Sequence, residues 1–382
     1  MFALDKVIVS VRNIKNELID GIDKVDLVKT KILTKFDLKD NPRANNKEKI
    51  YPQSSGHKSR ELNHINYIEI EKVRHEFFNI NIEYNYSKFF NKTNFIPIKT
   101  QGEKELVDSN IKELLSEVLK IDKKYISFEY SHLEAAKQIN VVRFSDYNNV
   151  FNLLYRGFVN FTDDEIKIRC IYDDFSKRTK RGFTKGFAFS FGKGLTFTVY
   201  NKSLENNMKV LDLEDMVKET ALKGEFKISK SNLKRIAQSA DIDTVSLPHL
   251  KKTIPEYFDL IIKKVVLYQL QENKKELEKR LKKLERITPR ILETFVVENN
   301  EWILDYDFIG WILKCQLKES KPERTIRRYQ KIAKEKLIQL ETSNSPKRSN
   351  SKNIKKLELL VGELFGIKLN IKLCEDGEIQ IF

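Results

Sequence analysis

Apolar and polar residues alternate along several stretches in the first two-thirds of the chain, and this alternation predicts β-strands. The clearest stretches, rich in β-branched and aromatic residues, are 5–13 (DKVIVSVRN), 65–72 (INYIEIEK) and 77–86 (FFNINIEYNY). Further strands are predicted at 125–140, at 186–192 and 195–200 with a short glycine-bearing turn between them, and at 222–228. The polar tract at 41–63 predicts a long loop.

Apolar residues at helical spacing predict helices at 104–120 and 145–157, and the pattern from about residue 229 onward is helical. Residues 254–287 combine a run of charges with widely spaced leucines and isoleucines, which predicts a long exposed or coiled-coil-like helix. Two helices within 303–340 follow, then a linker at 343–352 and a terminal hairpin that turns at 374–378. Because no steady βαβ rhythm is present, we expect an α+β fold with a mainly antiparallel sheet and flanking helices, followed by a mostly helical C-terminal region.

The composition favours a polyanionic partner. The 382 residues include 70 Lys and Arg against 55 Asp and Glu, a formal net charge of +15 that suits nucleic acid. A chain rich in Lys, Ile and Asn is also what an AT-rich genome encodes, so the charge alone does not decide the partner. The three cysteines form no CxxC pair, and we find no signal peptide, long apolar segment or GxxxxGK[ST] motif. We therefore expect a cytoplasmic protein with no membrane partner, and neither a zinc ribbon nor a nucleotide-driven helicase.

His132 and Glu134 are separated by one leucine in the strand predicted at 125–140. Because successive side chains of a strand point to opposite faces, His132 and Glu134 share one face and lie close enough together to bind one divalent cation. The alternative is a partly exposed strand whose His and Glu only hydrogen-bond to their neighbours. Two other segments carry related chemistry: GLTFTVYNKSLE contains Tyr200, Lys202 and Glu205, and GEFKI contains Glu225.

Cleavage of one DNA strand by transesterification needs a nucleophilic hydroxyl, a divalent metal that polarises the scissile phosphate, and a cation that stabilises the transition state. The three segments contain residue types for all three roles. Oxygen and imidazole ligands suit Mg²⁺ or Mn²⁺ better than a structural zinc ion.

The residue patterns of these segments, and their order along the chain, resemble those of the rolling-circle replication initiators of phages and plasmids. These are HUH-type endonucleases and include the filamentous-phage gene II endonuclease. HLEAAKQIN at 132–140 is similar to the family's R-[IL]-D-[IVA]-A-x-N-[IF] strand, with His for Arg, Glu for Asp and Gln for Asn. VYNKSLE at 199–205 matches a strand that ends vYdKxxE, and GEFKI resembles the R-x-E strand. Upstream, the segment at 82–95 is similar to S-x-x-K-F-x-x-G-N-N, with Ser87, Lys88, Phe89 and Asn94 in register. The similarity runs from about residue 1 to residue 235.

The resemblance implies an enzyme that nicks and rejoins one strand of origin DNA and so starts rolling-circle replication. Tyr200 would be the nucleophile, with Tyr130, Tyr155 and Tyr172 as rival hydroxyls. Lys202 would stabilise the phosphate charge, Glu205 would orient it, and Lys88 would contact DNA. The superfamily holds its metal with two histidines around a hydrophobic residue, so here Mg²⁺ or Mn²⁺ would be held by His132, Glu134 and Glu225.

This interpretation of the chain as a replication initiator predicts four parts: an N-terminal α+β part (1–120), a nicking core (121–235), a helical region for DNA binding or oligomerisation (236–342), and a linker with a small helix and hairpin (343–382). Five cations on the second helix of 303–340 would follow a phosphate backbone in the manner of a helix-turn-helix, or form a plain basic surface: Arg324, Arg327, Arg328, Lys331 and Lys334. The expected partner is origin DNA, double- and single-stranded, with a host helicase, a host polymerase and a second copy of the chain as further candidates.

Two other classes of protein stay open on the residues alone. A non-catalytic, sequence-specific replication initiator of winged-helix type explains the charge and the arginine-rich helix equally well, but it needs neither the metal ligands nor VYNKSLE. A coiled-coil interaction protein is supported only by residues 254–287. Strand cleavage that depends on a divalent metal distinguishes the enzyme from both.

Overall fold

The computed structural model describes residues 3–35, 48–51, 64–74, 76–91, 98–141, 147–162, 167–173, 186–201, 220–300, 302–344 and 353–382. In these ranges a nine-stranded sheet has the order β4-β5-β6-β1-β7-β11-β10-β9-β8. Its strands are β1 (Ala3–Lys15), β4 (Glu48–Ile50), β5 (Ile65–Arg74), β6 (Phe77–Asn85), β7 (Glu129–Val141), β8 (Ile168–Asp173), β9 (Gly186–Phe191), β10 (Leu195–Asn201) and β11 (Thr220–Ser229).

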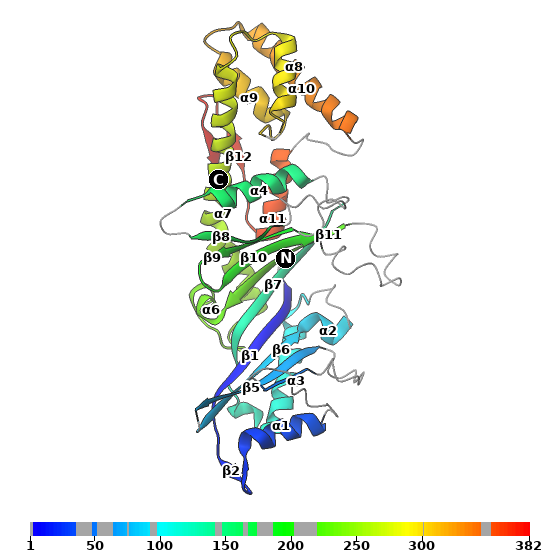
Figure 1. Ribbon diagram of the computed structural model, residues 1–382, viewed down its shortest axis with the longest axis vertical. Coiled ribbons are helices and arrows are strands. Elements are labelled where there is room, and N and C mark those ends of the chain that lie inside the picture. The colour runs from blue at the N-terminus through cyan, green and yellow to red at the C-terminus, as the bar shows by residue number, and fades with distance from the viewer. Residues whose placement is uncertain are drawn as a thin grey trace. The chain divides into compact units, whose positions relative to one another are not determined.

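Antiparallel pairing is the rule in this sheet (Figure 1). β1 pairs with β6 and β7, β5 pairs with β4 and β6, and β8 pairs with β9, all in antiparallel register. The prediction of a mainly antiparallel sheet is therefore confirmed. The tract at 41–63 is not entirely a loop, because β4 lies within it and pairs Lys49 with Glu69 of β5.

The C-terminal part is mostly helical, as predicted (Figure 1). The helices are α1 (Lys24–Lys35), α2 (Tyr86–Asn91), α3 (Gln101–Leu119), α4 (Asn148–Asn160), α6 (Lys230–Ile236), α7 (Leu247–Lys282), α8 (Pro289–Glu298), α9 (Tyr306–Leu317), α10 (Glu323–Asn344) and α11 (Asn353–Phe365). Two small hairpins complete the fold, β2 (Leu18–Ile19) with β3 (Ile22–Asp23) and, as predicted, β12 (Ile371–Leu373) with β13 (Ile379–Ile381). Among the helices of the described ranges, none combines the length and the apolar character needed to span a bilayer.

The chain forms two compact units. Unit 1 comprises residues 1–137, 193–197 and 225–254, and unit 2 comprises residues 138–192, 198–224 and 255–382. Each unit therefore combines segments that lie far apart in the sequence.

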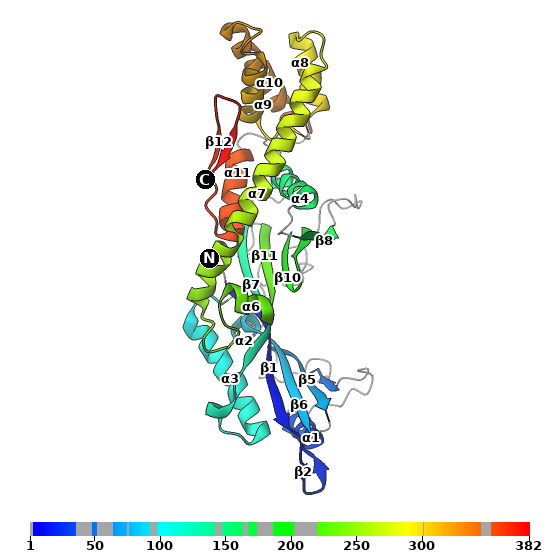
Figure 2. The same ribbon diagram turned by 90° about the vertical axis from the view of Figure 1, so that its left-hand side faces the viewer.

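The core of unit 1 forms between one face of the sheet and α3, which runs beside β1 in Figure 2. Alternate residues of β6 are fully buried: Phe78, Ile80, Ile82 and Tyr84. α3 contributes Val107, Ile111 and Leu115 to the same core. A capping box starts α3, because Thr100 Oγ1 accepts from the Glu103 N–H while the Glu103 carboxylate accepts from the Thr100 N–H.

A buried polar network ties α3 to β6, to α2 and to the loop after α6. Asp108 accepts hydrogen bonds from the hydroxyls of Tyr84 (2.6 Å) and Tyr86 (2.7 Å) and from Lys104 Nζ (2.8 Å). Lys104 also donates to the carbonyl of Ile242 at 2.7 Å. Lys104 is 2% exposed and Asp108 is 4% exposed, so both charges depend on these partners rather than on water.

Unit 2 has an aromatic core between α4 and β9. Phe158 of α4 lies 4.8 Å from Phe189 and 5.7 Å from Phe191, measured between ring centroids. Phe151, two turns earlier on the same side of α4, packs against Phe187 with the ring centroids 6.2 Å apart. These pairs follow from the alternating aromatic residues of β9, which the sequence pattern identifies as a strand.

The long helix predicted at 254–287 is α7, but its apolar face is not exposed. Phe258 packs against Phe191 of β9 and Phe365 of α11, with centroid distances of 5.2 and 6.2 Å. Further along α7, Val265, Leu270 and Leu277 are buried. The expectation of an exposed or coiled-coil-like helix is therefore wrong, since these residues belong to the core of unit 2.

Candidate functional site

Three carboxylates from three adjacent strands of the sheet converge in unit 1. They are Asp5 of β1, Glu134 of β7 and Glu225 of β11. One carboxylate oxygen from each lies within 4.8 Å of the others. The three residues are 4%, 8% and 8% exposed respectively, so this carboxylate cluster is almost entirely buried.

The register of β1 and β7 explains how two of these groups meet. Leu4 pairs with Ala135 and Val7 pairs with Leu133, so two residues of β1, Asp5 and Lys6, lie opposite the single residue Glu134. This is a β-bulge, a feature that re-aims side chains and is frequent beside functional sites. Leu133 is fully buried in the core, and Glu134 therefore faces the other side of the sheet, as its alternation with Leu133 predicts.

Asn85 holds Asp5 in position. Its amide nitrogen donates to Asp5 Oδ1 at 3.2 Å. Its amide oxygen accepts from the backbone N–H of Lys88, at 2.9 Å, in the first turn of α2. Asn85 thus joins the end of β6 to the carboxylate cluster and fixes the orientation of Asp5.

Two lysines lie against Glu134. Oε1 of Glu134 is 3.0 Å from Lys227 Nζ and 3.4 Å from Lys6 Nζ. Burial raises the pKa of Glu134, an effect that the two lysines oppose and that Glu225 reinforces. Burial lowers the pKa of Lys6, but Glu134 and Glu83 outweigh it, so the net pKa is raised and Lys6 stays charged. Glu134 is therefore held between charge repulsion from Glu225 and partial neutralisation by the lysines.

His132 lines a cavity of about 230 Å³ together with Lys6, Glu83, Glu134 and Lys227. It shares this face with Glu134, as the alternation of β7 predicts. Burial lowers the pKa of His132, with Glu83 acting in the opposite direction, so the imidazole is neutral at pH 7. His132 is not among the three groups whose oxygens converge, and Asp5 takes the place that the sequence pattern gave to this histidine.

The donor set of the carboxylate cluster fits a hard divalent cation. Three carboxylates supply only oxygen ligands, which Mg²⁺ and Mn²⁺ prefer. Neighbouring ligands of an octahedral Mg²⁺ ion, each held at about 2.1 Å from the metal, lie about 3 Å apart. The three carboxylate oxygens, within 4.8 Å of one another, therefore need to close by at most about 2 Å.

The tyrosines that the sequence offered as nucleophiles lie in different surroundings. Tyr130 is fully buried, with its hydroxyl 3.0 Å from that of Tyr86, and burial raises its pKa well above 10, which excludes it as a nucleophile. Tyr155 packs against Phe189, with ring centroids 5.9 Å apart. Tyr200 is the next-to-last residue of β10 in unit 2 and is half-buried, on the strand face opposite the buried Val199. The side chain of Tyr172 lies outside the described residues, as do Lys202 and Glu205.

The residues expected to bind DNA differ in exposure. Lys88 in α2 is half-buried, and its Nζ lies 3.4 Å from the side-chain oxygen of Asn66. The five cations of α10 that were expected to follow a phosphate backbone are all exposed: Arg324, Arg327, Arg328, Lys331 and Lys334. Of these two groups, only α10 presents its cations freely to solvent.

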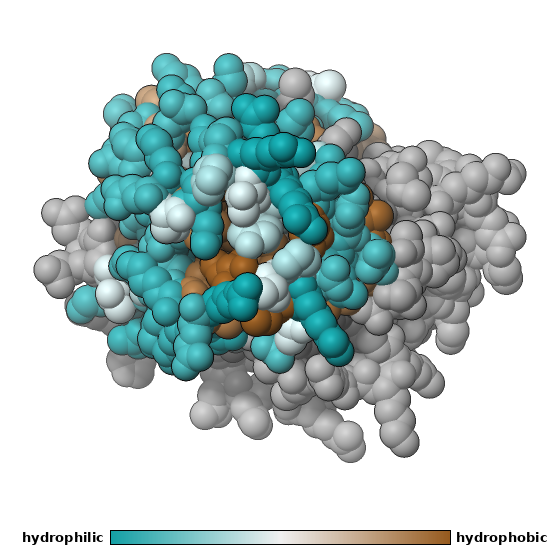
Figure 3. Space-filling view, turned by 90° about the horizontal axis from the view of Figure 1, so that it is seen from above, coloured by the Kyte–Doolittle hydropathy of each residue, from teal (hydrophilic) through white to brown (hydrophobic). Residues whose placement is uncertain are grey.

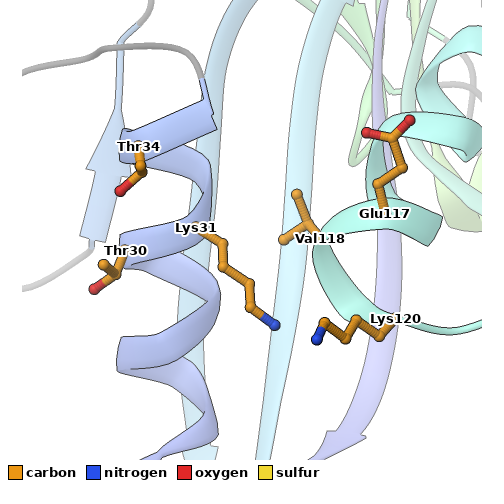
Figure 4. A pocket seen from close by; sticks show the side chains of 6 residues that line it. All are labelled: Thr30, Lys31, Thr34, Glu117, Val118 and Lys120. Carbon is orange, nitrogen blue, oxygen red and sulfur yellow. The ribbon is translucent and has the colours of Figure 1, made fainter.

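A second cavity in unit 1, of about 400 Å³, lies between α1 and the end of α3. Figure 4 shows the ammonium groups of Lys31 and Lys120 pointing toward one another across it, while Glu117 points away. Thr30, Thr34 and Val118 complete its lining. This cavity contains no converging carboxylates and no histidine, so the carboxylate cluster is the stronger candidate for chemistry.

Comparisons with models of known protein families and with curated proteins found no match to this sequence. The case for a function therefore depends on the residues and their geometry.

The sequence patterns identify neither Asp5 nor Asn85 as a site residue. Asp5 stands at the start of the first predicted strand, where the adjacent charges of Asp5 and Lys6 between Leu4 and the apolar run that begins at Val7 are unusual for a buried strand. This charged pair is the available signal. Nothing in the sequence distinguishes Asn85 from the other asparagines of the chain, because its role depends on the long-range pairing of β6 with β1.

Proposed function

We propose that this protein is a metal-dependent endonuclease that nicks and rejoins one strand of origin DNA to start rolling-circle replication. The observation that carries the proposal is the buried cluster of Asp5, Glu134 and Glu225 on an antiparallel sheet. The similarity of VYNKSLE and HLEAAKQIN to the rolling-circle initiators supplies the reaction type. The net charge of +15 supports DNA as the substrate.

In this proposal Asp5, Glu134 and Glu225 bind Mg²⁺ or Mn²⁺. If bound there, the metal ion would polarise the scissile phosphate. Lys227, which is half-exposed beside Glu134, adds positive charge at the rim of the site. Asn85 keeps the carboxylate of Asp5 aligned with the other two.

Tyr200 is the proposed nucleophile. Its phenolic oxygen forms a bond to the scissile phosphorus while the bond from phosphorus to the 3′ oxygen breaks. The products are a 5′-phosphotyrosine and a free 3′-hydroxyl, and the reverse reaction rejoins the strand. By resemblance, Lys202 stabilises the phosphate charge and Glu205 orients it, and the free 3′-hydroxyl serves a host polymerase.

The experiment that tests the proposal is a nicking assay on supercoiled and single-stranded DNA, with Mg²⁺, Mn²⁺ or EDTA. We expect metal-dependent strand cleavage that Glu134→Gln and Tyr200→Phe each abolish. Lys124→Gln is a matched control, because Lys124 is exposed and its ammonium group contacts its sequence neighbours Asp122 and Tyr125, away from the carboxylate cluster. Tight DNA binding without cleavage in any metal would instead favour the non-catalytic initiator.

A further inference from the structure

α8, α9 and α10 pack together in unit 2 and leave one face of α10 uncovered. The buried stripe of α10 consists of Ile326, Tyr329, Ala333 and Leu337. The Tyr329 hydroxyl donates to the carbonyl of Ile287 at 2.7 Å, and Gln330 donates to the carbonyl of Gly310 in α9 at 2.7 Å. These contacts fix the rotation of α10, and hence which residues face the solvent.

The uncovered face of α10, together with the turn before it, is strongly basic. Residues 318–336 contain eight cations and three glutamates: Lys318, Lys321, Arg324, Arg327, Arg328, Lys331, Lys334 and Lys336 against Glu319, Glu323 and Glu335. Figure 3, seen from above relative to Figure 1, shows mostly hydrophilic residues around a small apolar centre at the end where Figure 1 places α8, α9 and α10. About a third of the net charge of the chain is therefore concentrated in one helix and its turn.

Four of these eight cations have no side-chain partner within the described residues, and two of the four, Arg324 and Arg328, lie in α10 itself. Arg327 pairs with Glu323 at 3.2 Å and Lys331 with Glu335 at 3.8 Å. Arg324 and Arg328 form no ion pair or hydrogen bond with any residue that the structure describes. Because they are four residues apart, their side chains lie on the same face of α10. They are exposed guanidinium groups that a planar, doubly accepting anion or base edge would match.

We propose that the uncovered face of α10 binds duplex DNA by entering the major groove, with Arg324 and Arg328 as its main contacts. The major groove of B-DNA admits one α-helix, and a recognition helix contacts bases through its N-terminal residues. Arg324 and Arg328 lie in the first two turns of α10, which begins at Glu323. Guanine offers the acceptor pair that arginine matches best.

Other nucleic acids fit this face less well. Single-stranded binding relies on exposed aromatic side chains that stack on bases. The aromatic residue of α10, Tyr329, is 8% exposed and faces α8. The major groove of A-form RNA is too narrow for a helix. Duplex DNA is therefore the partner that the geometry favours.

The hairpin β12–β13 does not act as a basic wing. It is tied to α9, because Trp311 Nε1 donates to the carbonyl of Cys374 at 2.7 Å. Its exposed tip carries Glu375, Asp376 and Glu378. Phosphates repel these carboxylates, so the duplex contacts α10 and not the hairpin.

This inference goes beyond the nicking reaction and does not require it. α10 lies in unit 2, whereas the carboxylate cluster lies in unit 1. Binding through α10 is expected without any divalent metal. A failure of strand cleavage would therefore leave the duplex-binding face untouched, and the reverse also holds.

The test measures fluorescence anisotropy of a random-sequence 30-base-pair duplex with the full chain in EDTA, across a salt series. For Arg324→Ala/Arg328→Ala we expect the affinity at about 0.1 M salt to fall roughly 10- to 100-fold, and the slope of log affinity against log salt to fall by about two. Lys355→Ala/Lys368→Ala is the matched control, since both lysines are exposed in unit 2 and their loss changes the net charge equally. The control should retain nearly all of the affinity.

A second variant separates base contacts from phosphate contacts. Arg324→Lys/Arg328→Lys keeps the charge but loses the two-pronged contact with guanine. A selection from the random pool should give an enriched sequence with the wild-type chain and a weaker preference with this variant. The proposal is overturned if the alanine variant and the control bind the duplex equally, or if the wild-type chain binds single strands but not duplex.

Discussion

Replacing Lys104 by Met tests whether the buried network of unit 1 is organised by charge. Lys104 Nζ is 2.8 Å from Asp108 and 2.7 Å from the carbonyl of Ile242, and the side chain is almost inaccessible. Met fills a similar volume but leaves the Asp108 carboxylate buried without its cation. Breaking a buried ion pair on one side costs about 3–5 kcal/mol. We expect Lys104→Met to lower the free energy of unfolding of unit 1 by that amount.

Lys112→Met is the matched control. Lys112 lies on the same helix and reaches the same loop, where its Nζ is 2.6 Å from Asp243. The Asp243 side chain is 70% exposed, so water replaces the lost partner. Exposed ion pairs contribute at most about 1 kcal/mol. The Lys112–Asp243 salt bridge should therefore contribute less to the free energy of unfolding than the Lys104–Asp108 salt bridge, although it is the shorter of the two.

The assay is urea unfolding of the full chain, combined with hydrogen exchange of the α3 and β6 amides. Burial raises the pKa of Asp108, which Lys104 and the two tyrosines oppose. Because this folded pKa lies above the unfolded value, the ionised carboxylate lowers stability as the pH rises, and removal of Lys104 strengthens that trend. The cost of Lys104→Met should therefore shrink as the pH falls toward the pKa of Asp108. Equal costs for the two variants, or a cost of Lys104→Met that does not change with pH, would refute the reasoning.

Three further outcomes are expected. Burial lowers the pKa of His64 to about 4, so His64 takes up a proton at a lower pH in the folded state than in the unfolded state. About 3 kcal/mol of stability is therefore lost as the pH falls from 6.5 to about 4. His64→Phe should flatten this pH dependence in urea unfolding. Gly186→Ala should cost at least about 3 kcal/mol in thermal unfolding, because its φ is +125° and the new Cβ would lie 1.8 Å from the Val199 oxygen. Glu134→Gln should weaken Mn²⁺ binding in calorimetry by at least roughly 100-fold, whereas Glu83→Gln should have a much smaller effect.

Local patterns were sufficient to predict most elements of the fold. The alternation in β1, β5 and β6 and the helical spacing in α3 correctly predict these elements, because each element buries one consistent face. β4 was not predicted, because it has only three residues in a polar tract and is defined only by its pairing with β5. α7 was misread as exposed because its charges are visible in the sequence, whereas the residues that cover its apolar face come from β9 and α11.

The candidate site was predictable only in part. Glu134 and Glu225 stand in strands that the sequence identifies, and β11 does lie beside β7. The meeting of Asp5 with these two groups depends on a bulge in β1, and such a shift of register leaves no mark in the sequence. His132 shares the face of Glu134 as expected, but sharing a face does not bring its ring into the carboxylate cluster.

The proposed nicking reaction joins this protein covalently to DNA. The most direct test is intact-mass spectrometry of the chain after incubation with single-stranded oligonucleotides and Mn²⁺, followed by peptide mapping. We expect a mass increase equal to the 5′-phosphorylated part of a cleaved oligonucleotide, carried by Tyr200 and absent from Glu134→Gln. An unmodified chain and uncut oligonucleotides of every sequence in a random pool, with both Mn²⁺ and Mg²⁺, would contradict it.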